Sequence, residues 1–267
     1  MQQSHNSACF KGEDSTLHGF QSYLCRIVME NFDKRLGSFF VAESESPLRC
    51  SHYVIDIGIS MKSLLDLNDD CLIEIFKYLS LVEAFKVIDV RNARLTEIAH
   101  QRISTFKELN ITIREFPNFN AEQLRIIGEN IYSLSMTCGY SIPTQNVLNI
   151  MQPLCKGAAA TNQLRVFSLN YVYFNKEYCQ YIGNAAAKLQ KLNLNYCQLT
   201  DKLLTDLLKS CNDLLELEIL GNYTLNGEFL NKLHLPTLRV LKLELHAEWN
   251  YPMENFKIKN PNVKLII

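Results

Sequence analysis

An apolar pattern repeats along the chain from Phe106 to the carboxyl end. Its template, L-x-x-L-x-L, places apolar side chains two residues apart, as in a short strand with one buried face. Successive copies begin 25, 33, 25, 25, 24 and 25 residues apart, the last interval leading to a weaker copy at Val263. The six clear copies are Phe106/Leu109/Ile111, Ile131/Leu134/Met136, Leu164/Phe167/Leu169, Leu189/Leu192/Leu194, Leu214/Leu217/Ile219 and Leu238/Leu241/Leu243. Such a period is the signature of a repeat architecture.

A second, helix-like segment follows several of these strands. Thr200 and Asp201 precede an amphipathic stretch that starts at Leu203, and Asn120 and Asn226 precede similar stretches. Residues of these types commonly cap the start of a helix. A strand and a helix in every 25 residues predict an α/β solenoid, with parallel strands on its concave face and helices on its convex face.

One interval is eight residues longer than the common period of 25. Pro153, Gly157 and Ala158 interrupt the pattern in this part of the chain. Proline and glycine are the strongest local markers of turns and loops. We therefore expect the extra residues to form a bulging loop at residues 152–161.

The pattern in residues 61–104 is helical. Asn68 is suited to capping a first helix, whose apolar residues recur at the helical spacing from Leu72 onward. Ser80 and Glu83 form a capping box for a second helix, and a third apolar stripe starts at Leu95. Three short helices predict a small bundle, which buries little apolar surface alone and so favours a partner or a neighbouring domain.

Residues 1–60 carry no clear periodicity, and we expect a poorly ordered leader there. Met61 stands just before the first patterned segment, so the leader could also be an optional extension. The expected organisation is thus a leader at 1–60, a helical domain at 61–104 and a repeat domain at 105–267.

Residues 64–79 resemble the opening of an F-box. In that family the first half of the opening is usually Leu-Pro followed by an acidic pair, and the second half is Leu-x-x-Ile-Phe-x-x-Leu. Leu72, Ile75, Phe76 and Leu79 match this half of the motif residue for residue. Asn68 stands where the family prefers proline, but both residue types favour the start of a helix.

The tail resembles the cysteine-containing leucine-rich repeats that often follow an F-box. The pattern Leu189-x-x-Leu192-x-Leu194-x-x-Cys197 matches, one residue short before the Thr-Asp cap. Asn222 occupies the column of Cys197 in the next repeat, and we expect its side chain to satisfy backbone groups where the chain leaves the strand.

This combination implies a non-catalytic subunit of a ubiquitin ligase. F-box proteins bind the Skp-type adaptor of a cullin ligase through the helical motif and capture a protein substrate with the repeats. An amphipathic helix that fills a partner's groove is a common recognition mode. The residues that the resemblance assigns to adaptor binding are Leu67, Leu72, Ile75, Phe76, Leu79, Leu81, Phe85 and Val90. The alternative, that this stripe packs inside the bundle, stays open.

Strand geometry predicts which repeat residues face a substrate. Because side chains alternate along a strand, the residues between the leucines point out of the concave face. This face should be mostly polar and uncharged, and Tyr171 and Tyr196 should stack on adjacent strands or simply pack together at the margin of the sheet. The predicted substrate-facing residues are Asn110, Ser135, Ser168, Asn170, Tyr171, Asn193, Asn195, Tyr196, Glu218, Lys242 and Glu244.

Composition narrows the class of partner. The 27 basic and 28 acidic residues nearly balance, which removes the usual electrostatic reason to propose a nucleic acid. Nine dispersed cysteines, an odd number without a C-x-x-C pair, favour reduced thiols in a cytoplasmic or nuclear protein. No apolar run reaches the length of a membrane span.

The sequence offers no support for catalysis, a metal or a cofactor. The six histidines are scattered and do not have the spacing of a zinc site. The sequence also contains no phosphate-loop motif. Cys138, Cys197 and Cys211 fall at repeat positions and are expected to be small buried side chains. The competing interpretation of the chain is a repeat scaffold unconnected with ubiquitin transfer.

Overall fold

A computed structural model describes residues 64–233, 235–244 and 249–267. The predicted leader at 1–60 and Met61 lie outside these residues. The chain divides between Arg102 and Ile103 into two compact units. We call them the helical unit and the repeat unit.

From residue 64 onward, where its description begins, the helical unit contains one short 3-10 helix and three α-helices. Asn68 caps the first α-helix by accepting a hydrogen bond from the backbone N–H of Cys71 at 2.9 Å, as predicted. Both hydrogen bonds of the predicted capping box between Ser80 and Glu83 are present at the start of the second. The elements are η2 (Leu64–Asp66), α2 (Asp69–Phe76), α3 (Leu81–Asp89) and α4 (Ala93–Ser104).

Two arginines of α4 bind the backbone around α2. Arg94 forms an ion pair with Asp69 at 2.6 Å and donates to the backbone oxygen atoms of Leu65 and Leu67. Arg102 donates two hydrogen bonds, at 2.9 and 2.8 Å, to the carbonyl oxygen of Leu79. These bonds satisfy carbonyl groups that lie outside the regular helices, and so they fix α4 against the ends of α2.

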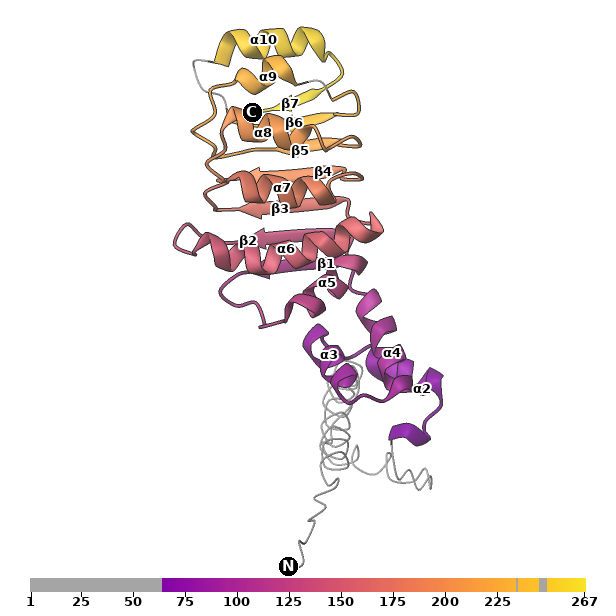
Figure 1. Ribbon diagram of the computed structural model, residues 1–267. Helices are drawn as coiled ribbons and strands as arrows, with labels where there is room; N and C mark the ends of the chain where they lie inside the picture. Colours follow the sequence, from indigo (N-terminus) through magenta and orange to yellow (C-terminus); the bar gives the residue numbers. More distant parts are fainter. Residues whose placement is uncertain (1–63, 234, 245–248) are drawn as a thin grey trace, which may run out of the picture. The chain divides into compact units, whose positions relative to one another are not determined.

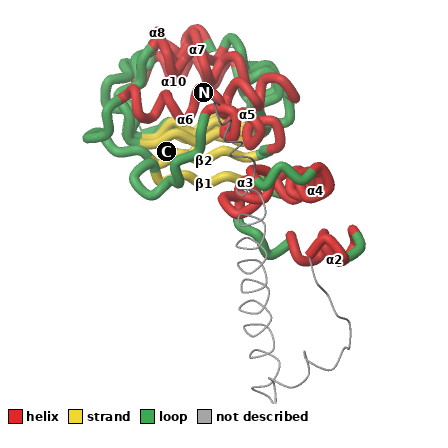
Figure 2. Tube along the Cα trace, turned by 60° about the horizontal axis from the view of Figure 1, so that its bottom comes forward, coloured by secondary structure: helices red, strands yellow, loops and turns green. Residues whose placement is uncertain are grey.

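The repeat unit is an open sheet of seven parallel strands in chain order, each joined to the next through a helix (Figure 1). The helices lie together along one side of the sheet (Figure 2). The strands are β1 (Glu108–Thr112), β2 (Ser133–Thr137), β3 (Val166–Asn170), β4 (Lys191–Asn195), β5 (Glu216–Glu218), β6 (Val240–Lys242) and β7 (Lys264–Ile266). The helices are α5 (Ala121–Asn130), α6 (Thr144–Thr161), α7 (Lys176–Ala185), α8 (Asp201–Leu208), α9 (Glu228–Lys232) and α10 (Asn250–Lys259). The fold is therefore α/β and solenoid-like, as the periodicity predicted.

The predicted register is confirmed for the first six strands. The second leucine of each copy pairs across the sheet in one row: Leu109, Leu134, Phe167, Leu192, Leu217 and Leu241. The last copy is displaced by one residue, because Leu241 pairs with Leu265 rather than with Ile266. Leu265 is half-buried and Ile266 is 38% exposed, so the prediction that this copy starts at Val263 was wrong by one position.

The predicted loop at residues 152–161 is wrong: these residues form the second half of α6, an 18-residue helix that contains Pro153. Eight extra residues lengthen a helix by about 12 Å. The glycines in this region serve close helix packing, because a Cβ atom on Gly157 would lie 2.0 Å from the carbonyl oxygen of Arg125 in α5. Reciprocally, a Cβ atom on Gly128 would lie 2.1 Å from the carbonyl oxygen of Leu154.

Asn222 is the one buried polar residue recorded among the described residues, and it binds two neighbouring repeats together. Its Oδ1 atom accepts hydrogen bonds from the backbone N–H groups of Cys197 (3.0 Å) and Leu199 (3.1 Å). Its Nδ2 group donates to the carbonyl oxygens of Leu194, Ile219 and Leu220, at 2.7 to 3.1 Å. The expected role of this column is thus confirmed.

Candidate recognition face

The sheet of the repeat unit has one face that the helices leave uncovered, which we call the open face. Along each central strand, buried apolar residues alternate with less buried residues, most of which are polar. The predicted substrate-facing residues at the strand centres lie in one paired row across the sheet: Asn110, Ser135, Ser168, Asn193, Glu218 and Lys242. Asn170 and Asn195 form the neighbouring row, and Glu244 follows two residues after Lys242.

Asparagine side chains connect the strands of the open face. Asn195 donates to Glu218 at 2.6 Å and accepts from the backbone N–H of Leu220 at 2.8 Å. Asn170 donates to the hydroxyl of Ser168 at 3.1 Å. The Oδ1 atom of Asn193 is buried without a hydrogen-bond partner, which is uncommon for a buried polar atom.

Charges on the open face are mostly paired with one another. Lys242 binds Glu216 at 2.7 Å and Glu218 at 3.0 Å, and Lys191 binds Glu216 at 2.9 Å. Partial desolvation raises the pKa of Glu216, but hydrogen bonds from Lys242 and Lys191 outweigh it and hold the pKa below its usual value. The hydrogen bonds that Lys242 donates to the carboxylates of Glu216 and Glu218 raise the pKa of Lys242. The predicted row therefore has a charged neighbour row, with Lys191 and Glu216, that the sequence analysis missed.

Tyr171 and Tyr196 stack as predicted, with ring centroids 4.9 Å apart and planes 8° from parallel. Each directly follows a strand and has a left-handed backbone, with φ of 62° and 54°. A left-handed conformation costs a bulky residue roughly 1–2 kcal/mol. Gly221 takes the same place in the next repeat, with φ of 67°, and a Cβ atom there would lie 2.2 Å from the Tyr196 ring. The stacked pair therefore depends on a glycine beside it.

Three further tyrosines extend this pair into a patch. Tyr140 lies 5.1 Å from Tyr173 and 6.1 Å from Tyr171 between ring centroids, and its hydroxyl donates to the carbonyl oxygen of Tyr196 at 2.7 Å. Tyr223 follows β5, and the nearby negative charge of Glu244 is the main reason that its pKa is raised. We call Tyr140, Tyr171, Tyr173, Tyr196 and Tyr223 the tyrosine patch.

The sequence contains a signal for the missed tyrosines. Tyr140, Tyr173 and Tyr223 occupy equivalent positions in three repeats. In each of these repeats the tyrosine stands three residues after the second outward-facing residue. Gln198 has this position in the repeat of β4. Tyr173 is 62% exposed and Tyr223 is 64% exposed. A column of large exposed aromatic residues at the carboxyl ends of strands is thus visible once the repeats are aligned.

The residues assigned to adaptor binding divide into two groups in the helical unit. Leu72, Phe76 and Leu79 are at most 1% exposed and form a core with residues of α3 and α4, and Phe85 is 3% exposed. For Leu72, Phe76, Leu79 and Phe85 the structure favours the alternative that the sequence left open, because these side chains pack inside the helical unit itself. The half-buried members are Leu67, Ile75, Leu81 and Val90.

No group of three or more His, Cys, Asp and Glu side chains arranged to hold a metal ion occurs within the described residues. Burial raises the pKa of the Cys138 and Cys155 thiols to about 12, and it raises the pKa of Cys197 as well. Thiols that stay protonated at neutral pH are poor nucleophiles. These cysteines therefore act as apolar core residues.

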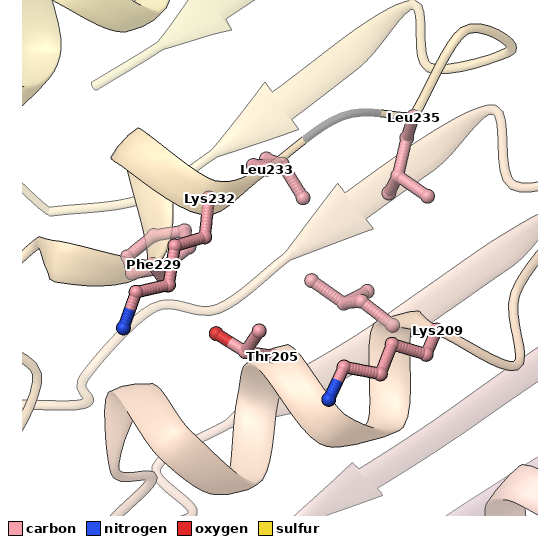
Figure 3. Close-up of a pocket in the computed structure, with 7 residues that line it drawn as sticks. Thr205, Lys209, Phe229, Lys232, Leu233 and Leu235 are labelled. Carbon is pink, nitrogen blue, oxygen red and sulfur yellow. The ribbon is translucent and has the colours of Figure 1, made fainter.

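A small cavity lies between α8 and α9, on the side of the sheet away from the open face. Its volume is about 120 Å³, and it is lined by Lys232 and Phe229 on one side and by Thr205 and Lys209 on the other (Figure 3). Ligand sites usually measure about 300–1,000 Å³. Lys209 is also engaged by Asp206 at 2.7 Å, so this cavity is too small and too weakly charged to be the main functional site.

Comparison with known proteins adds no family assignment. No protein-family model matches the sequence, and a search of curated proteins finds no match. Throughout the described ranges, each helix is too short or too polar to cross a membrane.

Proposed function

We propose that the protein is the substrate-recognition subunit of a Skp–cullin–F-box ubiquitin ligase and has no catalytic activity of its own. The helical unit would bind the Skp-type adaptor, and the leucine-rich repeats would bind a protein substrate. The observation that supports this best is the order of the parts: helices with the F-box pattern precede a repeat sheet that has an open face and carries the tyrosine patch at the carboxyl ends of its strands. Such a protein would act in the cytoplasm, the nucleus or both.

The half-buried residues of α3 are the best remaining candidates for adaptor contact. Leu81 is the first residue of α3 and Val90 is its C-cap. Neither belongs to the core cluster of Leu72, Phe76 and Leu79. An adaptor groove that covers both ends of α3 would bury these two side chains without opening the unit.

The test is co-purification of the full chain with a Skp-type adaptor, comparing wild type with a Leu81→Asp/Val90→Lys double variant. An acid at the start of α3 and a cation at its end suit the helix dipole, so the variant should fold. An unpaired charge in an apolar interface costs about 3–5 kcal/mol, so binding should weaken at least about a hundredfold. The matched control is Glu97→Lys, a charge change at an exposed position of α4.

A wild-type chain that folds but binds no adaptor would refute the ligase proposal. The alternative is a non-catalytic repeat scaffold unconnected with ubiquitin transfer. The burial of Leu72 and Phe76 favours this alternative, since a helical unit with a closed core needs no adaptor to cover it. The same experiment separates the two functions.

A further inference from the structure

The tyrosine patch has a charged residue at each of its two ends. Arg114 follows β1 and donates a hydrogen bond to the hydroxyl of Ser141, next to Tyr140, at 2.7 Å. Glu244 follows β6, beside Tyr223. Five strand spacings of about 4.8 Å separate β1 from β6, so these charges lie roughly 24 Å apart. The patch therefore has a basic end and an acidic end.

The acidic end has an excess of negative charge. Glu216 and Glu218 share Lys242 and Lys191 in ion pairs. No ion pair to Glu244 is recorded among the described residues, although Lys242 lies only two positions away in the sequence. Lys242 already binds two carboxylates, whereas the partner recorded for Glu244 is the neutral hydroxyl of Tyr223, which does not neutralise the negative charge of Glu244.

Tyr223 supplies an aromatic surface next to this carboxylate. It is 64% exposed, and its hydroxyl donates a hydrogen bond to the carboxylate of Glu244, whose negative charge raises the pKa of Tyr223. An arginine guanidinium stacks on a tyrosine ring and can also bind a carboxylate through two parallel hydrogen bonds. A lysine ammonium lacks the planar shape that serves both contacts.

We propose that Tyr223 and Glu244 bind an arginine side chain in an extended segment of the protein partner, with the rest of the tyrosine patch contacting the residues beside it. This deepens the proposed function, because it rests on the repeat unit being the part of the protein that captures a substrate. Charge complementarity points to a cationic side chain at this end, and the hydroxyl-rich patch suits the polar backbone of an extended chain.

The experiment is selection of binding peptides from a random peptide library on the immobilised full chain. The recovered peptides should be enriched in arginine, and a Glu244→Gln variant should lose that enrichment. Glu254→Gln is the matched control, because Glu254 is an exposed carboxylate on α10, and it should leave the enrichment unchanged. Recovery of no binding peptides, or of peptides without arginine enrichment, would overturn the proposal.

A second measurement assigns the effect to the two residues. The affinity of one selected peptide is compared with that of the same peptide carrying citrulline, a neutral isostere, in place of arginine. Citrulline should weaken binding to wild type about tenfold, and both Glu244→Gln and Tyr223→Leu should reduce that difference to less than about threefold. An unchanged arginine preference in these variants would place the cation elsewhere and contradict the proposal.

The result is independent of the ligase. Arginine-selective binding without adaptor binding would refute the ligase function and support the arginine site. Adaptor binding without arginine selectivity would support the ligase function and refute the arginine site.

Discussion

The helical unit and the repeat unit both bury most of their apolar pattern residues but present different surfaces. In the helical unit, Leu72 and Phe76 lie at the centre of three helices that close around them. In the repeat unit, Phe167 and Leu192 are covered by a single layer of helices, and the opposite face of the sheet stays open. A bundle closes on its own core, whereas a one-sided sheet keeps a long surface for recognition.

This difference separates the residues that build each core from the residues that can contact a partner. In both units, the residues that make the sequence pattern recognisable are those that build the core. The residues that can contact a partner lie between them, such as Leu81 in the helical unit and Tyr223 in the repeat unit. The comparison predicts that pattern residues affect stability and that intervening residues affect binding.

The largest expected effect comes from deleting a core aromatic side chain in each unit. Phe76→Ala should lower the free energy of unfolding of the helical unit by about 3–5 kcal/mol, and Phe167→Ala should lower that of the repeat unit by a similar amount. Hydrogen exchange of the full chain should show each loss confined to its own unit. Loss of protection in both units from either substitution would mean that they unfold as one body.

A smaller effect separates two asparagines of the repeat unit. Asn222→Leu removes the acceptor for two buried N–H groups and should cost roughly 2–5 kcal/mol. Asn193→Ser should cost less than about 1 kcal/mol, because the Oδ1 atom of Asn193 has no partner and serine occupies the same row in β2 and β3. Urea unfolding of the two variants measures the difference, and equal costs would show that the hydrogen bonds of Asn222 contribute little.

The smallest predicted effect is a pH dependence from Cys155. Burial raises the pKa of this thiol from 9.0 to about 12, so the folded state favours the protonated form. Its contribution to stability is fully present below pH 9 and is lost as the pH rises toward 12. Between pH 8 and pH 10, wild type should lose roughly 1 kcal/mol more than Cys155→Ala. Parallel pH profiles of the two proteins in urea unfolding would exclude this role.

Much of the repeat unit was predictable because its information is local and repeated. Alternation fixed which face of each strand is buried, and the period of 25 fixed the pairing from Leu109 to Leu241. The last strand was placed one residue off, since consecutive apolar residues from Leu265 to Ile267 fit either register.

The failures share a cause: the sequence pattern does not tell what a residue packs against. Gly157 was interpreted as a loop signal, but it permits close contact between α5 and α6. The stripe around Phe76 showed an apolar face, but the pattern did not reveal that the neighbouring helices cover it. The pattern did not indicate Tyr140 and Tyr173, because they lie after the strands, where the alternation of buried and outward-facing residues has ended.

The central claim is that the helical unit binds an adaptor while the open face of the repeats remains available for a substrate. Hydrogen exchange of the full chain, with and without a Skp-type adaptor, tests both parts at once. We expect a one-to-one complex in which new protection from hydrogen exchange is confined to the helical unit and is strongest around α3. The exchange of the strands of the repeat unit should stay unchanged. Absence of a complex, or new protection along the open face instead, would contradict it.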